Sequence, residues 1–235
     1  MEWDELPALF PMFGDSSRWL PLLQSHQALI VEAEPHTRVT SVAHRDAVQR
    51  HYAESLETWR LAVQVAGHEP AIVVDVGSGG GYPGIVFACL APETTVHLIE
   101  PLQKRARLLD ATAKTLGLAN VTVLAARAED AGRGPLRGVA DLVTARAIAP
   151  LAELLEYTVP FAVLGGALVL PKGSALEGEL AHAHQAMAIL GCAHRQTLLM
   201  RPAISETVVL ACFEKTGETP STYPRRAGIP GKQPL

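Results

Sequence analysis

The pattern of hydrophobic and polar positions predicts an α/β fold built on a parallel sheet. From residue 71 onward, short apolar runs typical of buried strands alternate with longer segments of helical periodicity. The expected strands are Ile72–Val76, Val96–Ile99, Val121–Leu124, Leu142–Ala145 and Ala167–Leu170. The expected helices are Ile85–Leu90, Lys104–Leu116, Ala152–Phe161 and Leu176–Leu190. This alternation favours helices on both faces of the sheet and right-handed crossovers.

The two ends of the chain depart from this alternation. Gln196–Met200 and Thr207–Phe213 have no helix between them, which predicts an antiparallel hairpin at the sheet edge and brings the strands to seven. Such an ending is usual for methyltransferases and unusual for dehydrogenases. We expect an N-terminal helical cap over residues 1–70, a main domain over 71–214 and a basic tail over 215–235.

A glycine-rich break follows the first expected strand. Five glycines occur within the eight residues Gly77–Gly84, and a helical apolar segment begins directly after them. Glycines permit positive φ angles and let a ligand approach the backbone, and a helix N-terminus offers free N–H groups. Tyr82 and Pro83 stand at the helix start, where they favour a neutral adenosine over a pyrophosphate. This stretch predicts a nucleotide-like ligand without distinguishing a methyltransferase from a dehydrogenase.

Composition narrows the class of protein. The chain has 235 residues, of which 48% are hydrophobic and 19% charged, as in a folded globular protein. No apolar run reaches the roughly 20 residues of a membrane span, and the acidic N-terminus lacks the features of a secretory signal. The three cysteines are too widely spaced for a zinc site or a disulfide framework, so we expect a cytoplasmic protein without a metal.

Charge is unevenly distributed. The net charge is −4, yet the segment from residue 215 onward carries four basic residues against one acidic residue. This predicts local contact of the tail with an anionic partner, although a solvated tail has the same composition.

Polar side chains follow each expected strand, where ligands bind in open α/β sheets. Glu100 follows the second strand, at the position of an acid that binds ribose hydroxyls. Ala128, Glu129 and Asp130 follow the third, either to read an adenine edge or only as solvated loop residues. Arg146 follows the fourth and needs an anionic partner, which a ligand carboxylate, a substrate phosphate or Glu129 would provide. Lys172 follows the fifth and suits a phosphate or open solvent.

These residues together resemble one family. The sequence Asp75-Val-Gly-Ser-Gly-Gly-Gly-Tyr-Pro-Gly-Ile85, with Glu100, Lys104-Arg105, Arg127-Ala-Glu129, Thr144-Ala-Arg146-Ala and Lys172-Gly173, is similar to ribosomal RNA small subunit methyltransferase G, also called glucose-inhibited division protein B. Arg50-His51-Tyr-Ala-Glu-Ser55-Leu56 and the ending Tyr223-Pro-Arg-Arg226-Ala-Gly-Ile-Pro-Gly-Lys232 resemble its two terminal signatures. The resemblance extends over about residues 20–235.

The resemblance implies a Rossmann-like class I fold and a methyltransferase that uses S-adenosylmethionine (SAM) to methylate guanine N7 in 16S ribosomal RNA or the small ribosomal subunit. The SAM contacts of that family correspond to Gly77, Tyr82, Ala128 with Glu129, and Arg146. We add Gly79 and Glu100, because they follow the ends of the first two expected strands. We expect Lys172, Arg225, Arg226 and Lys232 to hold RNA phosphates. No general base is expected, because guanine N7 has a free lone pair and no proton; Arg146 has at most an orienting role.

Two questions stay open in the sequence. His51 and Ser55 would share a helix face, as a substrate contact or as an ordinary surface pair. A methyltransferase of a small molecule, and a nucleotide-binding regulator or NAD-type oxidoreductase, are the alternative functions.

Overall fold

A seven-stranded sheet forms the centre of the computed structural model, which describes all residues 1–235. The strand order is β3-β2-β1-β4-β5-β7-β6, and β7 alone runs antiparallel to its neighbours. The strands are β1 Ile72–Val76, β2 Thr95–Ile99, β3 Val121–Leu124, β4 Ala140–Ala145, β5 Ala162–Lys172, β6 Cys192–Leu199 and β7 Val209–Lys215. The predicted mostly parallel sheet with a C-terminal hairpin is therefore confirmed.

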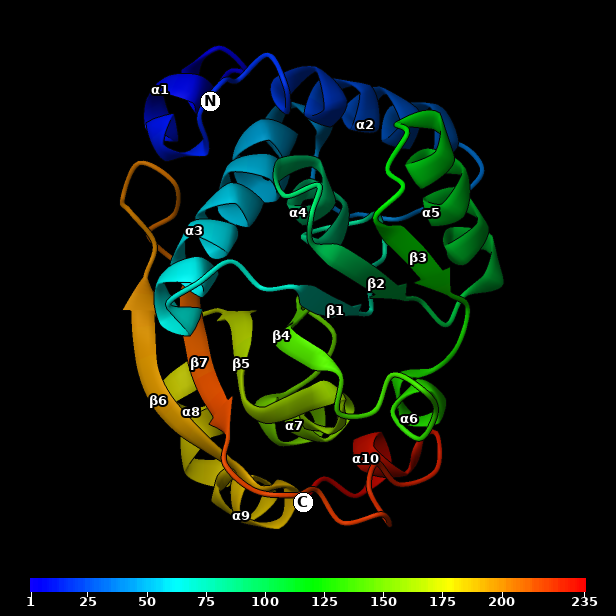
Figure 1. Cartoon of the computed structure of the whole chain (residues 1–235), viewed down its shortest axis with the longest axis vertical. Coiled ribbons are helices and arrows are strands. Elements are labelled where there is room, and N and C mark those ends of the chain that lie inside the picture. The colour runs from blue at the N-terminus through cyan, green and yellow to red at the C-terminus, as the bar shows by residue number, and fades with distance from the viewer.

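Helices cover both faces of this sheet (Figure 1). One face carries α1 Glu5–Leu9, α2 Leu20–Ala33, α3 Glu54–Ala66, α4 Gly84–Leu90 and α5 Gln103–Thr115. The other carries α6 Ala128–Ala131, α7 Leu151–Thr158, α8 Leu176–His182, α9 His184–Leu190 and α10 Ile229–Lys232. Three short 3₁₀ segments lie at Pro11–Phe13, His44–Asp46 and Val159–Phe161, and a π-helix spans Val48–Ala53.

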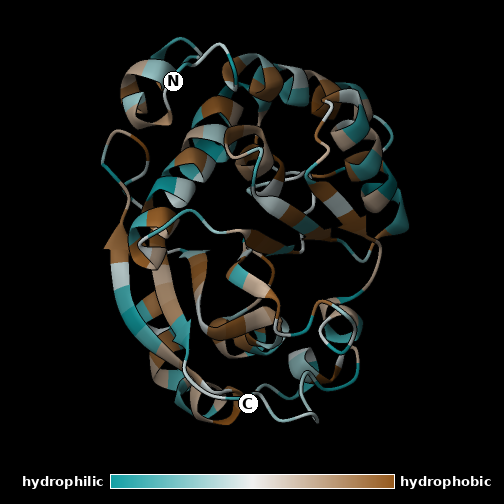
Figure 2. Ribbon diagram, viewed as in Figure 1, coloured by the Kyte–Doolittle hydropathy of each residue, from teal (hydrophilic) through white to brown (hydrophobic).

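Two hydrophobic cores lie on the two faces. Successive side chains of a strand point to opposite faces, so Val73 packs in the core under α1 to α5 while Val74 packs in the core over α6 to α9. Both residues are fully buried. The strands in the middle of the sheet are hydrophobic along their length, whereas exposed helix surfaces are polar (Figure 2). This is the pattern expected of a parallel sheet covered on both sides.

The N-terminal helices share a core with the main sheet. Leu23 of α2 and Leu56 of α3 belong to the same buried cluster as Val73 and Val96 of the strands. The N-terminal helices therefore belong to the layer on this face of the sheet, where α3 packs on β4 and β5 and α2 packs on α4 and α5.

Three elements differ from the expected pattern. The single helix expected over Leu176–Leu190 is two helices, because Ala183 between them has left the helical conformation. In the expected N-terminal helical cap, a π-helical segment, Val48–Ala53, precedes α3 and changes which residues share a face. Strand β5 is longer than its apolar core, because it continues through Gly165 and Gly166. None of these differences changes the order of the sheet.

All three cysteines are free and buried, and no helix has the length and hydrophobicity needed to cross a membrane.

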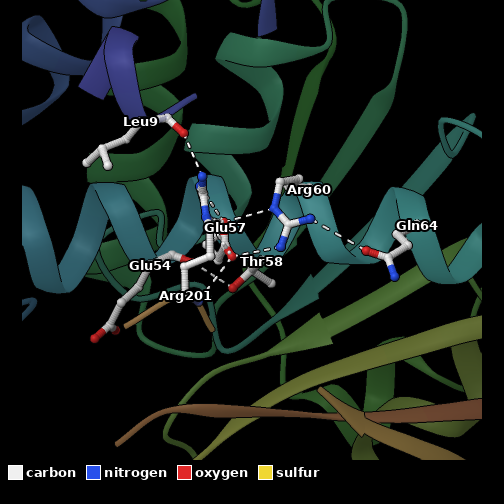
Figure 3. A network of polar contacts seen from close by, with 7 residues as sticks. All are labelled: Leu9, Glu54, Glu57, Thr58, Arg60, Gln64 and Arg201. Carbon is white, nitrogen blue, oxygen red and sulfur yellow. Dashed lines mark hydrogen bonds and ion pairs between the residues drawn. The ribbon is translucent and has the colours of Figure 1, made fainter. Parts of the chain in front are cut away.

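A buried carboxylate joins α3 to the segment that follows β6 (Figure 3). Glu57 is fully buried and accepts hydrogen bonds from Arg60, at 2.8 and 3.0 Å, and from Arg201, at 2.7 to 3.2 Å. Arg201 also donates to the carbonyl of Leu9 at the end of α1. Burial acts to raise the pKa of Glu57, but the two arginines outweigh it, so the pKa is lowered. The network fixes α1, α3 and the β6–β7 connection together.

We predict that Glu57→Gln lowers the free energy of unfolding by about 3 kcal/mol, because it leaves two partly buried guanidinium groups without a charged partner. Urea unfolding at neutral pH measures this loss. The control is Glu214→Gln, which breaks an exposed pair with Arg195 and should cost less than about 1 kcal/mol. Equal losses for the two variants would contradict this role of Glu57.

Candidate active site

The ladder of β1 brings three strand ends to one level. Val76 pairs with Ile99 of β2 on one side and with Ala145 of β4 on the other. The next residues along the chain, Gly77, Glu100 and Arg146, therefore start their loops side by side. The order of the sheet changes direction between β1 and β4, which is the position where ligands bind in doubly wound sheets.

A cleft of about 650 Å³ opens at this position. It is bounded by the glycine loop after β1, the loop after β4, the end of β5 and the segments that lead into α3. Its lining includes Thr40, Arg50, His51, Glu54, Gly77, Gly79, Tyr82, Arg146, Ile148, Lys172 and Glu179.

The glycine loop is held by backbone and carboxylate contacts. The N–H groups of Gly77 and Ser78 both donate to the carbonyl of Ile99, at 2.8 and 3.1 Å. Gly77 has φ +73°, and a Cβ atom on it would lie 2.6 Å from the Ile148 side chain. Gly79 has φ +56°, and a Cβ atom on it would make ordinary contacts with the carbonyls of Val39, at 3.7 Å, and Gly77, at 3.8 Å. Gly77 is thus required by both conformation and space, and Gly79 by conformation.

Glu100 supports this loop from beneath. It is 2% exposed, and its two carboxylate oxygens accept hydrogen bonds from the N–H groups of Gly79 and Leu102, both at 2.9 Å. Each oxygen keeps one further lone pair, but the side chain does not line the cleft. The structure therefore shows Glu100 as an anchor of the loop, and its contact with a ribose stays a prediction.

Asp75 is the other buried carboxylate under the loop. One of its oxygens accepts a hydrogen bond from the N–H of Gly84 at 3.1 Å, and the other has no partner. Complete burial raises the pKa of Asp75 to about 7, opposed by the nearby Ser78 hydroxyl and the hydrogen bond from Gly84 and assisted by the charge of Glu100. The Ser78 hydroxyl itself donates to the backbone carbonyl of Asp75. The first N–H of α4 is thus taken by Asp75 and is not free for a ligand.

Aromatic side chains from three segments form the wall beside the loop. The Tyr82 ring stacks on His51 with centroids 4.1 Å apart, and its hydroxyl lies 3.1 Å from that of Tyr52. Tyr52 also lies 3.2 Å from Nδ1 of His26, whose Nε2 is 2.9 Å from the carbonyl of Gly80. Burial lowers the pKa of His26 to about 4, so its ring is neutral. Since the carbonyl only accepts, Nε2 donates to Gly80 and Nδ1 accepts from Tyr52.

The π-helix places His51 against Arg146. The Nη2 atom of Arg146 donates to the carbonyl of Arg50 at 2.7 Å and lies 3.2 Å from Nδ1 of His51. Burial, then the charge of Arg146, lowers the pKa of His51 to about 3. The neutral ring therefore accepts at Nδ1 and donates from Nε2 to Thr40 at 2.7 Å. His51 has both nitrogens engaged and is 5% exposed, so it is not the surface pair that the sequence allowed.

Glu54 is the anion nearest to Arg146, with 3.6 Å between its Oε2 and Nη2 of the arginine. Burial lowers the pKa of Arg146, and Glu54 opposes that effect. Of the partners expected for Arg146, Glu129 is instead bound elsewhere, since its Oε1 accepts from the N–H of Gly228 at 2.9 Å.

Of the four cations expected to bind RNA, two form ion pairs within the protein and two are exposed without such a partner. Lys172 lies in the cleft but pairs with Glu179 at 2.6 Å. Arg225 forms a two-pronged pair with the fully buried Glu156, at 2.6 and 2.9 Å. Arg226 and Lys232 are exposed and form no ion pair.

The structure thus brings together some of the residues that were expected to bind SAM or RNA. Gly77, Gly79, Tyr82, Arg146 and Lys172 line one cleft. Glu100, Ala128, Glu129, Arg225, Arg226 and Lys232 do not line it. Sequence reasoning missed Glu54 and Glu179 as cleft residues and left His51 undecided. The sequence did offer an indication for Glu54, because this residue lies inside the Arg50–Leu56 stretch that resembles a family signature. It offered none for Glu179.

The chain was compared with protein families and with curated proteins. A family model described as rRNA small subunit methyltransferase G matches residues 20–206. The ribosomal RNA small subunit methyltransferase G of Leuconostoc citreum (strain KM20) is 36% identical over 214 residues, which is 90% of this chain and 89% of that protein. The protein of the same name from Roseiflexus castenholzii (strain DSM 13941 / HLO8) is 41% identical over 195 residues, or 81% of this chain and 80% of that protein.

Solved structures share the fold at low identity. Cofactor-bound Rv0187 from MTB matches with a TM-score of 0.55 at 19% identity, covering 84% of this chain and 91% of that one. M. jannaschii TYW2 in complex with AdoMet matches with a TM-score of 0.52 at 21% identity, covering 68% of this chain and 76% of that one. These similarities support the class I methyltransferase fold.

We predict that Asp75→Asn removes one component of the pH dependence of stability. Because the pKa of Asp75 in the folded protein lies above its ordinary value of 3.8, its contribution is complete below about pH 4 and is lost as the pH rises toward 7. Over that window the wild type should lose on the order of 1.4 kcal/mol per pH unit relative to the variant. Urea unfolding from pH 4 to 8 measures both proteins, and parallel curves would contradict the prediction.

Proposed function

The chain belongs to the rRNA small subunit methyltransferase G family, and we propose that it transfers the methyl group of SAM to N7 of a guanine in 16S ribosomal RNA. The observation that carries this proposal is the cleft in which the anchored glycine loop faces Arg146 across the point where the sheet order reverses. We further propose that the protein acts on the small ribosomal subunit or its RNA in the cytoplasm.

The residues of the cleft fit SAM. Gly79 lines the cleft and carries no side chain, so a ligand can approach the loop backbone there. The Tyr82 ring provides an apolar surface, and Arg146 provides a cation that complements the carboxylate of the methionine part. The loop after β3, with Ala128 and Glu129, would hold the adenine end, and Glu100 would reach the ribose. When bound, SAM supplies the electrophilic methyl group.

The protonation states of the cleft agree with a reaction that needs no general base. His51 is neutral, and its Nδ1, which is the nitrogen that could accept a proton, already accepts from Arg146. Guanine N7 carries no proton, so the enzyme has only to hold N7 in line with the methyl group. The stack of His51 on Tyr82 and the bonds of Arg146 make a rigid wall suited to that alignment.

The target guanine has to be unpaired or locally distorted when it reacts. N7 lies in the major groove, which is deep and narrow in an RNA helix. Helix α10 of the tail lies beside α6 and α7 (Figure 1). Arg226 and Lys232 of the tail are exposed and free to bind phosphates of the flanking RNA. Arg225 and Lys172 are proposed to assist only if the RNA competes with their present carboxylate partners.

The direct test is transfer of tritium from labelled SAM to small subunits or 16S RNA from a strain that lacks this protein. We expect incorporation at one guanine. Its position is located by the cleavage of the RNA strand that N7-methylguanosine permits. Gly79→Val should abolish both SAM binding and transfer, because valine does not adopt φ +56° and its side chain would enter the cleft. Gly178→Val, on α8 with open space and ordinary φ, is the matched control and should keep both. SAM binding without incorporation into any ribosomal substrate would exclude the RNA assignment.

We predict that the double variant Arg226→Gln/Lys232→Gln binds 16S RNA more weakly and lowers the slope of log K against log salt by about 2. It should leave SAM affinity unchanged, since neither residue lines the cleft. Point variants are preferable to deleting the tail, because deletion would leave Glu156 buried without Arg225. Arg195→Gln on β6 is the control, and filter binding at several salt concentrations is the measurement. An unchanged slope would indicate a small-molecule substrate or a different RNA surface.

A further inference from the structure

We propose that Glu54 recognises the target base by accepting hydrogen bonds from N1–H and the exocyclic N2 amino group of guanine. This role rests on the proposed function and adds to it the residue that selects guanine.

Glu54 is a buried carboxylate with unused hydrogen-bonding capacity. It is 3% exposed and lines the cleft, and its Oε1 has no hydrogen-bond partner. Arg50 Nε lies 3.2 Å from Oε1 but is not oriented to donate to it, and Arg146 Nη2 lies 3.6 Å from Oε2, so neither arginine forms a hydrogen bond with the carboxylate. A buried acceptor without a donor is costly, and a ligand that brings two donors would remove that cost.

Two arginines favour the ionised form of Glu54. Burial raises the pKa of Glu54, and the charges of Arg146 and Arg50 oppose that effect. In its ionised form the carboxylate has only acceptor sites. It therefore complements a pair of neighbouring donors and repels an acceptor.

The place of Glu54 in the fold assigns it to the substrate half of the cleft. It begins helix α3, which packs on β4 and β5. Apart from Arg146, which follows β4, the residues expected to hold SAM follow β1, β2 and β3, on the other side of the point where the sheet order reverses. A second hollow, lined by Arg50, Ser205 and Thr207, adjoins the cleft on the same side as Glu54. An RNA strand lying there would place one base against Glu54.

Guanine chemistry fits this acceptor. Its Watson–Crick edge presents N1–H and N2–H side by side, and proteins read extruded bases on that edge. Adenine has an acceptor at N1 and would place a lone pair against the carboxylate. N7 lies on the Hoogsteen edge, which a contact of Glu54 with N1–H and N2–H does not cover, so the methyl acceptor stays free to face SAM.

The competing role for Glu54 is a contact with the ammonium group of SAM, with Arg146 on its carboxylate. The two roles differ in what Glu54→Gln changes. Loss of a base contact lowers RNA methylation at constant SAM affinity, whereas loss of an ammonium contact weakens SAM binding itself.

The experiment uses the full chain, calorimetry with SAM, and single-turnover methylation of 16S RNA ligated to carry guanosine or inosine at the mapped target. Inosine keeps N7 and N1–H but lacks the N2 amino group. The wild type should methylate inosine about 10- to 100-fold more slowly, the value of one hydrogen bond to a charged group. Glu54→Gln should bind SAM within about 3-fold of wild type, methylate guanosine about 100-fold more slowly, and show an inosine penalty below about 3-fold.

Glu57→Gln is the matched control, because Glu57 lies one turn away on α3, is equally buried and also contacts two arginines, but does not line the cleft. It should lose stability and keep the full inosine penalty. An unchanged penalty in Glu54→Gln, or a SAM affinity lowered more than 10-fold, would overturn the role of Glu54 alone. Absence of guanine methylation by the wild type would overturn the proposed function, and the role of Glu54 with it.

Discussion

The parallel pairing of β1 with β2 on one side and β4 on the other determines the rest of the site. It sets Val76, Ile99 and Ala145 at one level, so the three loops that follow begin together at one edge of the sheet. Each loop then meets the others through short contacts. Glu100 binds the N–H of Gly79, and Ile148 occupies the space that a side chain on Gly77 would need. The cleft is therefore a consequence of strand register, and no single loop could form it alone.

A second group of contacts closes this edge from the side of the N-terminal helices. His26 of α2 holds the carbonyl of Gly80, and Tyr52 joins His26 to Tyr82. The π-helix then directs His51 onto the Tyr82 ring and toward Arg146. Hydrogen bonds and stacking hold these aromatic side chains in place, so they form a rigid wall of the cleft. The buried charges beside this wall are those of Arg146 and Glu54. The N-terminal segment thus supplies the side of the cleft that distinguishes it from a bare glycine loop.

The fold and the centre of the site could be predicted from the sequence, because both depend on local patterns. Apolar runs such as Ile72–Val76 mark buried strands, and the glycines after Val76 mark the loop. What could not be predicted depends on contacts between distant residues. The pairs Arg225–Glu156 and Lys172–Glu179 turn two expected RNA contacts into internal ion pairs, and Glu129 binds Gly228 in the tail. A π-helix also has no simple periodicity signal, so the orientation of His51 and Glu54 was not accessible.

The glycine loop, Tyr82 and Arg146 suit SAM and not a dinucleotide. Calorimetric titration of the protein with SAM and, separately, with NAD compares the two ligands in the same buffer. We expect saturable binding of SAM at one site and no heat of binding with NAD. Binding of NAD without binding of SAM would contradict it.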